Sequence, residues 1–231
     1  MTSRLRALAT AAVIAGAAAG ALLAAPAAAR PDDAFTSIFT GGDFEGAGWA
    51  SCPTAIVWDA DVSELSARGQ RNALSDLGWA LATWGRASGL AVSRGESVPL
   101  RYDNTSATVT GGVPGSRKIY VKFVEDQEST YLSGRVVGVA TPTSVNPTGE
   151  EIIGGSAAFR VDYVEYASKS ESRTLLLHEL GHALGLGHSS DRTSVMYPIV
   201  TSSTVLSSAD RAGIRAFTKP CDPAFAAQRG Q

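Results

Sequence analysis

Histidine, methionine and cysteine are all scarce in this chain of 231 residues, which contains three histidines, two methionines and two cysteines. The histidines lie together between positions 178 and 188, and none occurs elsewhere. One methionine is the initiator, and the other, Met196, follows the histidine cluster closely. A chain that places every histidine in one short segment points to a single shared role for them.

Long apolar runs are absent after residue 29, so we expect no membrane-spanning helix in the rest of the chain. The first 29 residues are typical of a secretory signal. Arg4 and Arg6 form a short basic start, an alanine-rich run follows from Ala7, and Ala27–Ala29 supply the small residues that a signal peptidase needs. An uncleaved anchor helix is the alternative, although alanine is only weakly membrane-seeking. The pattern favours a secreted, extracellular protein.

A strong excess of charge of either sign is also absent. The chain has 20 basic and 22 acidic residues, and loss of two arginines with the expected signal would leave 18 basic and 22 acidic ones, a net charge of −4. Nothing in this balance indicates nucleic acid or an anionic membrane surface as a partner. The roughly 200 residues that remain are enough for one domain with a sizeable core, which we expect to be a monomer.

The histidine segment has the pattern HExxHxxGxxH, formed by His178, Glu179, His182, Gly185 and His188. Histidines four positions apart lie on one face of a helix, where both imidazoles can reach one zinc ion. Glu179 is rotated off that direction, so it would lie beside the metal and deprotonate a bound water. Gly185 can adopt a left-handed conformation, which would end the helix and allow His188 to return as the third ligand.

Three protein ligands and one open position are typical of a catalytic zinc, whereas a structural site is closed by four. A bare HExxH also arises by chance on amphipathic helices, but the third histidine and the glycine at fixed offsets are much harder to obtain by accident. We therefore predict one catalytic Zn²⁺ with Glu179 as the general base.

This motif resembles that of the metzincins, a clan of zinc endopeptidases. Ser194–Pro198, with Met196 eight residues after His188, is similar to the metzincin Met-turn. Ser189 and the segment Leu206–Ile214 are similar to the corresponding parts of the matrixins within that clan. The resemblance covers roughly residues 50–220 and is sharp over 174–218.

The resemblance implies an α+β fold of the zincin or metzincin type, with a twisted mixed β-sheet, two long helices and a small C-terminal subdomain that ends in a helix. The catalytic domain would span residues 51–223. It would follow a signal peptide at 1–29 and an N-terminal tail or short propeptide at 30–50, and precede a C-terminal tail at 224–231. The implied activity is that of a zinc endopeptidase whose peptide or protein substrate lies extended in a cleft.

Supporting roles also follow from the resemblance. Met196 would sit beneath the zinc-binding histidines as a packing residue, and Tyr197 would line the floor of the substrate pocket. Asp210 would either hydrogen-bond the Met-turn backbone or simply interact with the dipole of its own helix. A strand at Gly155–Val161 would be the substrate-binding edge strand or, alternatively, an ordinary capped edge.

The chain departs from the animal matrixins in three respects. It has no spare histidine for their second, structural zinc, and their latency segment with its cysteine is not recognisable. Asp162 and Glu165 lie near the expected calcium-binding region, but the surrounding pattern differs, so no clear motif supports a calcium site.

Cys52 and Cys221 are the only cysteines. Secretion favours a disulfide between them, which would tie the start of the domain to its end. The rival interpretation is that Cys52 is a thiolate ligand that blocks the zinc in a latent form.

Apolar residues at helical spacing predict a helix over Ser66–Ala87 that ends at Gly89. Ser170 or Ser172 is expected to cap the active-site helix, and the final helix is expected to start near Ser207 or Ser208. The other expected elements are strands at Ile56–Trp58, Leu100–Tyr102, Ile119–Phe123 and Gly138–Thr141, and a loop at Pro142–Gly149.

Two other functions compete with the endopeptidase prediction. The chain could be a non-catalytic zinc-dependent binding protein, although such a protein would not need Glu179. It could also be a zinc hydrolase of cell-wall or other amide bonds.

Overall fold

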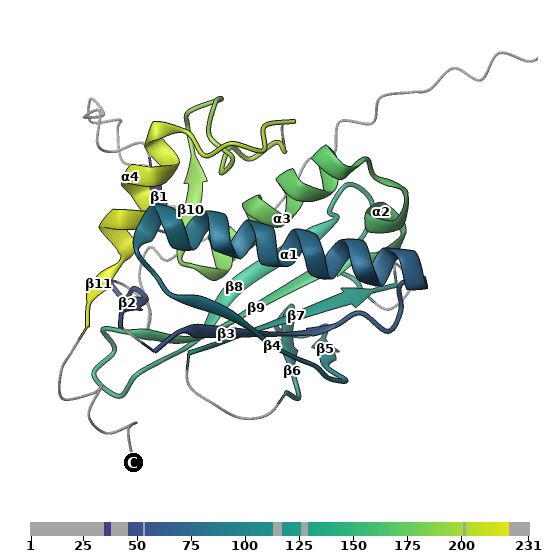
Figure 1. Cartoon of the computed structure of the whole chain (residues 1–231), viewed down its shortest axis with the longest axis horizontal. Coiled ribbons are helices and arrows are strands. Elements are labelled where there is room, and N and C mark those ends of the chain that lie inside the picture. Colours follow the sequence, from purple (N-terminus) through teal and green to yellow (C-terminus); the bar gives the residue numbers. More distant parts are fainter. Residues whose placement is uncertain are drawn as a thin grey trace, which may run out of the picture.

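The computed structural model describes residues 46–52, 54–112, 117–125, 129–200 and 202–221, and the backbone of 35–37. In these ranges the chain forms an α+β domain with helices packed on one side of a mixed five-stranded sheet (Figure 1). This arrangement confirms the expected fold class. The expected signal at 1–29 and the C-terminal tail at 224–231 lie outside the described residues.

The central sheet consists of four parallel strands and one antiparallel edge strand. In spatial order the strands are β4 (Val92–Ser97), β3 (Ile56–Asp61), β7 (Lys118–Val124), β9 (Ile152–Arg160) and β8 (Gly138–Val145). The strand predicted at Ile119–Phe123 forms most of β7, and the alternate residues Ile119, Val121 and Phe123 are fully buried in the main core.

The structure corrects two expectations about this sheet. Gly155–Val161 is not an edge strand, because β9 has β7 on one side and β8 on the other. The edge next to β9 is β8, which runs to Val145 and so includes the first part of the expected loop at Pro142–Gly149. Proline is a loop signal in most contexts, but an edge strand tolerates it because one row of its backbone groups needs no partner.

Four helices complete the domain, namely α1 (Ala67–Ser88), α2 (Val161–Tyr166), α3 (Lys169–Ala183) and α4 (Ser208–Phe217). The ends of α1 are as predicted, because the Ser66 hydroxyl accepts the Gly69 N–H at 3.0 Å and Gly89 ends the helix with φ of 81°. Helix α4 starts at Ser208, as expected, and Ser207 is its cap.

The cap of α3 differs from the prediction. Ser168 caps the helix, not Ser170 or Ser172, because its hydroxyl and backbone exchange hydrogen bonds with the backbone and carboxylate of Glu171. This reciprocal S-x-x-E pair satisfies two N-terminal donors at once, an advantage that neither later serine has.

Helix α3 lies deep in the protein, on the same side of the sheet as α1 (Figure 1). Its apolar residues Leu175, Leu176, Leu180 and Ala183 are fully buried, as expected for the helix that packs on the sheet. The Trp84 indole of α1 donates to the Leu177 carbonyl at 2.9 Å and joins the two helices. A helix buried on nearly all sides can place its polar residues in a dry environment.

Three pairs of short strands surround this core. They are the antiparallel hairpin of β5 (Arg101–Asp103) and β6 (Thr108–Thr110), the antiparallel pair of β1 (Phe35–Ser37) and β10 (Leu186–Ser189), and the parallel pair of β2 (Ala50–Ser51) and β11 (Lys219–Pro220).

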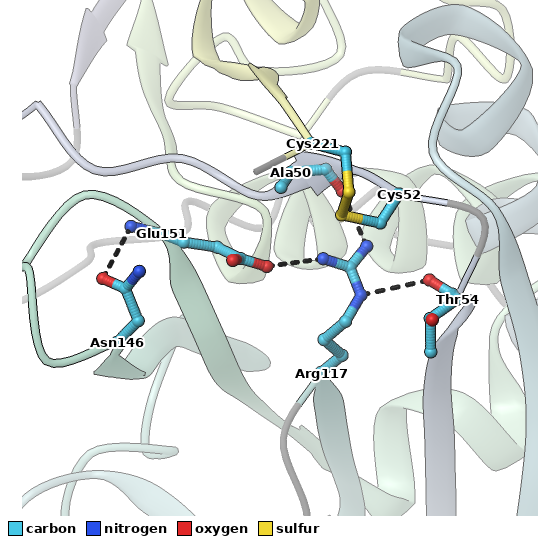
Figure 2. Close-up of polar contacts among 7 residues, drawn as sticks. All are labelled: Ala50, Cys52, Thr54, Arg117, Asn146, Glu151 and Cys221. Atoms are coloured by element: carbon cyan, nitrogen blue, oxygen red, sulfur yellow. Dashed lines mark hydrogen bonds and ion pairs between the residues drawn. A yellow bond between two sulfur atoms is a disulfide. The ribbon is translucent and has the colours of Figure 1, made fainter. Parts of the chain in front are cut away.

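A disulfide between Cys52 and Cys221 follows the third pair, with an S–S distance of 2.03 Å (Figure 2). It confirms the predicted bond and excludes Cys52 as a thiolate ligand in this state. None of the described helices is long and apolar enough to cross a membrane.

Candidate metal centre

The three histidines of the motif converge from two elements. His178 and His182 lie one turn apart on α3, and His188 lies on β10. One ring nitrogen from each can be chosen so that the three atoms are within 4.8 Å of one another. Among the described residues, no other group of three or more His, Cys, Asp or Glu side chains could hold a metal ion.

Hydrogen bonds to the backbone fix the orientation of two of these rings. The Nδ1 atoms of His178 and His182 lie 2.7 Å from the carbonyl oxygens of Val195 and Leu186. A carbonyl oxygen only accepts, so each Nδ1 carries the proton and each Nε2 presents a lone pair. Backbone partners of this kind select the tautomer and the ring orientation that a metal needs.

The two Nε2 atoms lie 3.1 Å apart, with lone pairs and no proton between them. Such a contact is repulsive unless a cation lies between the nitrogens. Two imidazoles bound to one tetrahedral zinc at about 2.0–2.1 Å would place their nitrogens about 3.3 Å apart. The residues present therefore fit a zinc ion in both spacing and donor type.

Burial keeps the histidines in the form that binds metal. It lowers the pKa of His178 to about 4, that of His182 well below its ordinary value, and that of the half-exposed His188 in the same direction. The imidazoles are consequently neutral at pH 7, and a neutral imidazole is the form that coordinates zinc.

Glu179 is fully buried, and neither carboxylate oxygen has a hydrogen-bond partner among the described residues. Burial raises the pKa of Glu179 to about 8. A buried carboxylate without partners is costly, and a nearby divalent cation would offset that cost by favouring the ionised form. Gly138 at the start of β8 leaves room for this side chain, because a Cβ at that position would lie 2.6 Å from Glu179 Cγ.

The chain reverses between the second and third histidines as the sequence predicts. Helix α3 ends at Ala183, and Gly185 has φ of 100°, a left-handed conformation that favours glycine. The Gly185 N–H donates to the His182 carbonyl at 2.9 Å. The turn therefore leads directly from one histidine to the strand that carries His188.

Met196 is fully buried and lies in the turn Ser194–Pro198, which packs against α3. A Cβ placed on Gly181 would be 2.4 Å from the Met196 sulfur, which shows how closely the turn approaches the helix. The Met196 carbonyl accepts from Ser189 N at 2.9 Å, which connects the turn to β10. The turn therefore contacts both elements that carry histidines.

Asp210 at the start of α4 anchors this turn. Its carboxylate accepts from the Ser194 hydroxyl at 2.5 Å and from Val195 N at 3.1 Å. The predicted hydrogen bond to the Met-turn backbone is confirmed. The role of the Ser194 hydroxyl was not predicted, since a serine in a turn has no signal that reveals a partner on a later helix.

Tyr197 is half-buried, and its ring lies 5.9 Å from the Arg192 guanidinium. Its place in a substrate pocket stays a prediction. The two calcium candidates have other partners, because Asp162 pairs with Arg160 at 2.7 Å and Glu165 accepts the Ser66 N–H at the start of α1.

The fold and the three-histidine cluster together define a metalloprotease of the metzincin type. Residues 77–218, more than half of the chain, match the family model described as matrixin. The chain therefore belongs to the matrixin family, whose members are zinc metalloproteases. No curated protein matches the sequence.

Proposed function

We propose that this matrixin is a secreted endopeptidase that cleaves peptide bonds with a metal-activated water and Glu179 as the general base. The convergence of the His178 and His182 Nε2 atoms carries the proposal. The unpartnered, buried carboxylate of the residue next to His178 supports the choice of base. The disulfide and the sequence of the first 29 residues support secretion.

His178, His182 and His188 would hold the zinc. The bound ion would supply a Lewis acid for the scissile carbonyl and lower the pKa of a coordinated water towards ~7. The carbonyls of Val195 and Leu186 would keep the two helical imidazoles in their binding tautomer throughout the reaction.

Glu179 would carry out the proton transfers. Its carboxylate takes a proton from the attacking water and returns it to the leaving amine nitrogen. With zinc bound by the three neutral histidines, this carboxylate would stay ionised and able to accept that proton. Since no described side chain donates to its oxygens, both are available to the water.

The edge strand β8 is the element that we propose binds the substrate backbone. It begins at Gly138, beside Glu179, and only one of its sides pairs with a strand of the central sheet. An extended peptide can pair with the free row of N–H and C=O groups on such an edge. A substrate aligned there would lie close to the proposed base.

Replacement of Gly138 by alanine is expected to lower kcat about 10–100-fold, because the new methyl group would displace the Glu179 side chain while leaving the histidines untouched. Steady-state cleavage of a fluorogenic peptide would measure kcat. Atomic absorption would measure the zinc content, which reports whether the histidines are untouched. Gly78→Ala is the control, since a Cβ there meets only Trp58 at 3.7 Å. A Gly138→Ala protein with wild-type kcat would contradict the steric role of this glycine.

Removal and return of the metal would test the proposed function. Casein cleavage by the purified secreted protein should stop with phenanthroline, which binds zinc far more strongly than calcium, and should return when zinc is restored. If a folded, zinc-loaded protein cleaves neither casein nor a peptide library, the endopeptidase proposal is wrong. Release of cell-wall fragments in place of peptides would favour a cell-wall or amide hydrolase, and zinc-dependent capture without cleavage a binding protein.

A further inference from the structure

The last carbonyl of α3 has a partner from a distant part of the chain. Ala183 ends the helix, and its C=O is one of the terminal carbonyls that helical N–H groups cannot reach. The Trp49 indole N–H donates to this oxygen at 3.1 Å, across 134 positions of sequence. Ala183 follows His182 directly, so this hydrogen bond acts where the chain leaves the second histidine for the third.

Trp49 belongs to a segment that is fixed independently of α3. Its side chain is 1% exposed and lies in the main core. Its own carbonyl accepts from Lys219 N at 2.9 Å, and the neighbouring Gly48 exchanges backbone hydrogen bonds with Glu150 and Ile152. The backbone at Trp49 is therefore fixed by the start of β9 and by β11.

A buried arginine and the disulfide hold the chain immediately after Trp49 (Figure 2). The Arg117 guanidinium donates to the carbonyls of Ala50 and Thr54 at 2.6 and 3.1 Å, and to the Glu151 carboxylate at 2.6 Å. Cys52 is bonded to Cys221 beside this group. The ion pair between Arg117 and Glu151 is almost completely buried, so its hydrogen bonds hold both side chains in one arrangement.

We infer that Trp49 is a positioning residue for the zinc site, which acts by fixing the helix end between His182 and His188. The inference rests on the proposed function of the three histidines as zinc ligands. Without the indole N–H, the Ala183 carbonyl would be buried without a partner, and the turn through Gly185 would lose its fixed starting point. His188 would then occupy a wider range of positions relative to His178 and His182.

The variant Trp49→Phe tests this inference, because it keeps an aromatic ring in the core and removes the N–H donor. Trp84→Phe is the matched control. Trp84 is equally buried and also donates its indole N–H to a backbone carbonyl of α3, but that carbonyl, at Leu177, lies inside the helix. There the helical N–H of Gly181 remains as a partner after the indole is lost.

We expect Trp49→Phe to raise the Kd for zinc about tenfold, measured by competition with a chromophoric chelator, while Trp84→Phe stays within about twofold of wild type. Replacement of zinc by Co²⁺ gives a second readout, since the visible absorption of the ion reports its ligand geometry. The band should shift or broaden in Trp49→Phe only. Equal zinc affinities and equal spectra in the wild type and Trp49→Phe would overturn the inference, as would an equal loss in both variants.

Three further outcomes can be told apart by these measurements. If Trp49→Phe does not fold, incorporation of 3-benzothienylalanine at position 49 preserves the shape of the indole and replaces only the N–H, and the same expectations apply to it. If the wild-type protein binds zinc but cleaves nothing, the proposed endopeptidase function is wrong. The effect of Trp49→Phe on the Kd for zinc can still be measured and tests the positioning role. A wild-type protein that binds no zinc would overturn both.

Discussion

Glu179→Gln is expected to lower kcat/KM for peptide cleavage about 10³–10⁴-fold while the protein keeps its zinc. Glutamine has nearly the shape of glutamate, but its amide cannot accept a proton from the attacking water at neutral pH. General acid–base catalysis by a positioned group contributes about 10²–10⁴-fold, and here one group would serve both proton transfers. Cleavage of a fluorogenic peptide and metal analysis of the same sample would give the two quantities.

Glu171→Gln is the control for this substitution. Glu171 lies on the same helix, in its exposed first turn, where it completes the capping box with Ser168. Glutamine also serves at that position, so activity and stability should stay close to wild type. Normal proteolysis by Glu179→Gln would exclude Glu179 as the base, whereas loss of both zinc and activity would indicate a structural role for the carboxylate.

Removal of the disulfide by Cys52→Ala with Cys221→Ala is expected to have the largest effect on stability. The bond links positions 169 residues apart, and closure of a loop of that length restricts the unfolded chain by about 5 kcal/mol in the entropic description. A domain of this size has about 5–15 kcal/mol of total stability, so the double variant would lose a large share of it. Urea unfolding followed by tryptophan fluorescence would measure the change.

Reduction of the wild-type protein supplies an independent check on that result. A reducing agent should lower the unfolding midpoint of the wild type towards that of the double variant and leave the double variant unchanged. The bond also anchors the segment that carries Trp49, so the double variant should bind zinc more weakly even where it is folded. An unchanged urea midpoint would show that Arg117 and the pairing of β2 with β11 hold the two ends without the disulfide.

Local features of this protein were predictable from the sequence because they depend on residues a few positions apart. The spacing of His178 and His182 places them on one helical face, and Gly185 and Gly89 mark helix ends because glycine adopts positive φ without strain. The limits of α1 and the cap of α4 follow from the same short-range chemistry. The disulfide was also predictable, since Cys52 and Cys221 are the only cysteines and secretion favours their pairing over a thiolate ligand.

Features that depend on which segments become neighbours could not be predicted in this way. The resemblance implied that Gly155–Val161 would be an edge strand, yet β8 occupies the edge, because the residues of a strand do not record how many strands lie beside it. The choice of Ser168 over two nearby serines depended on a reciprocal hydrogen bond with Glu171.

The residues that would carry the zinc chemistry of this matrixin can be found from their order along the chain: the three histidines, the carboxylate beside them and the glycine that turns the chain between them. The contacts that support these residues emerge only when the chain is folded. The Val195 carbonyl on His178, the Asp210 carboxylate under the Met-turn and the Trp49 indole on Ala183 are contacts between distant segments. Backbone carbonyls are the same at every position, so no residue type marks which of them will receive a buried donor once the chain has folded.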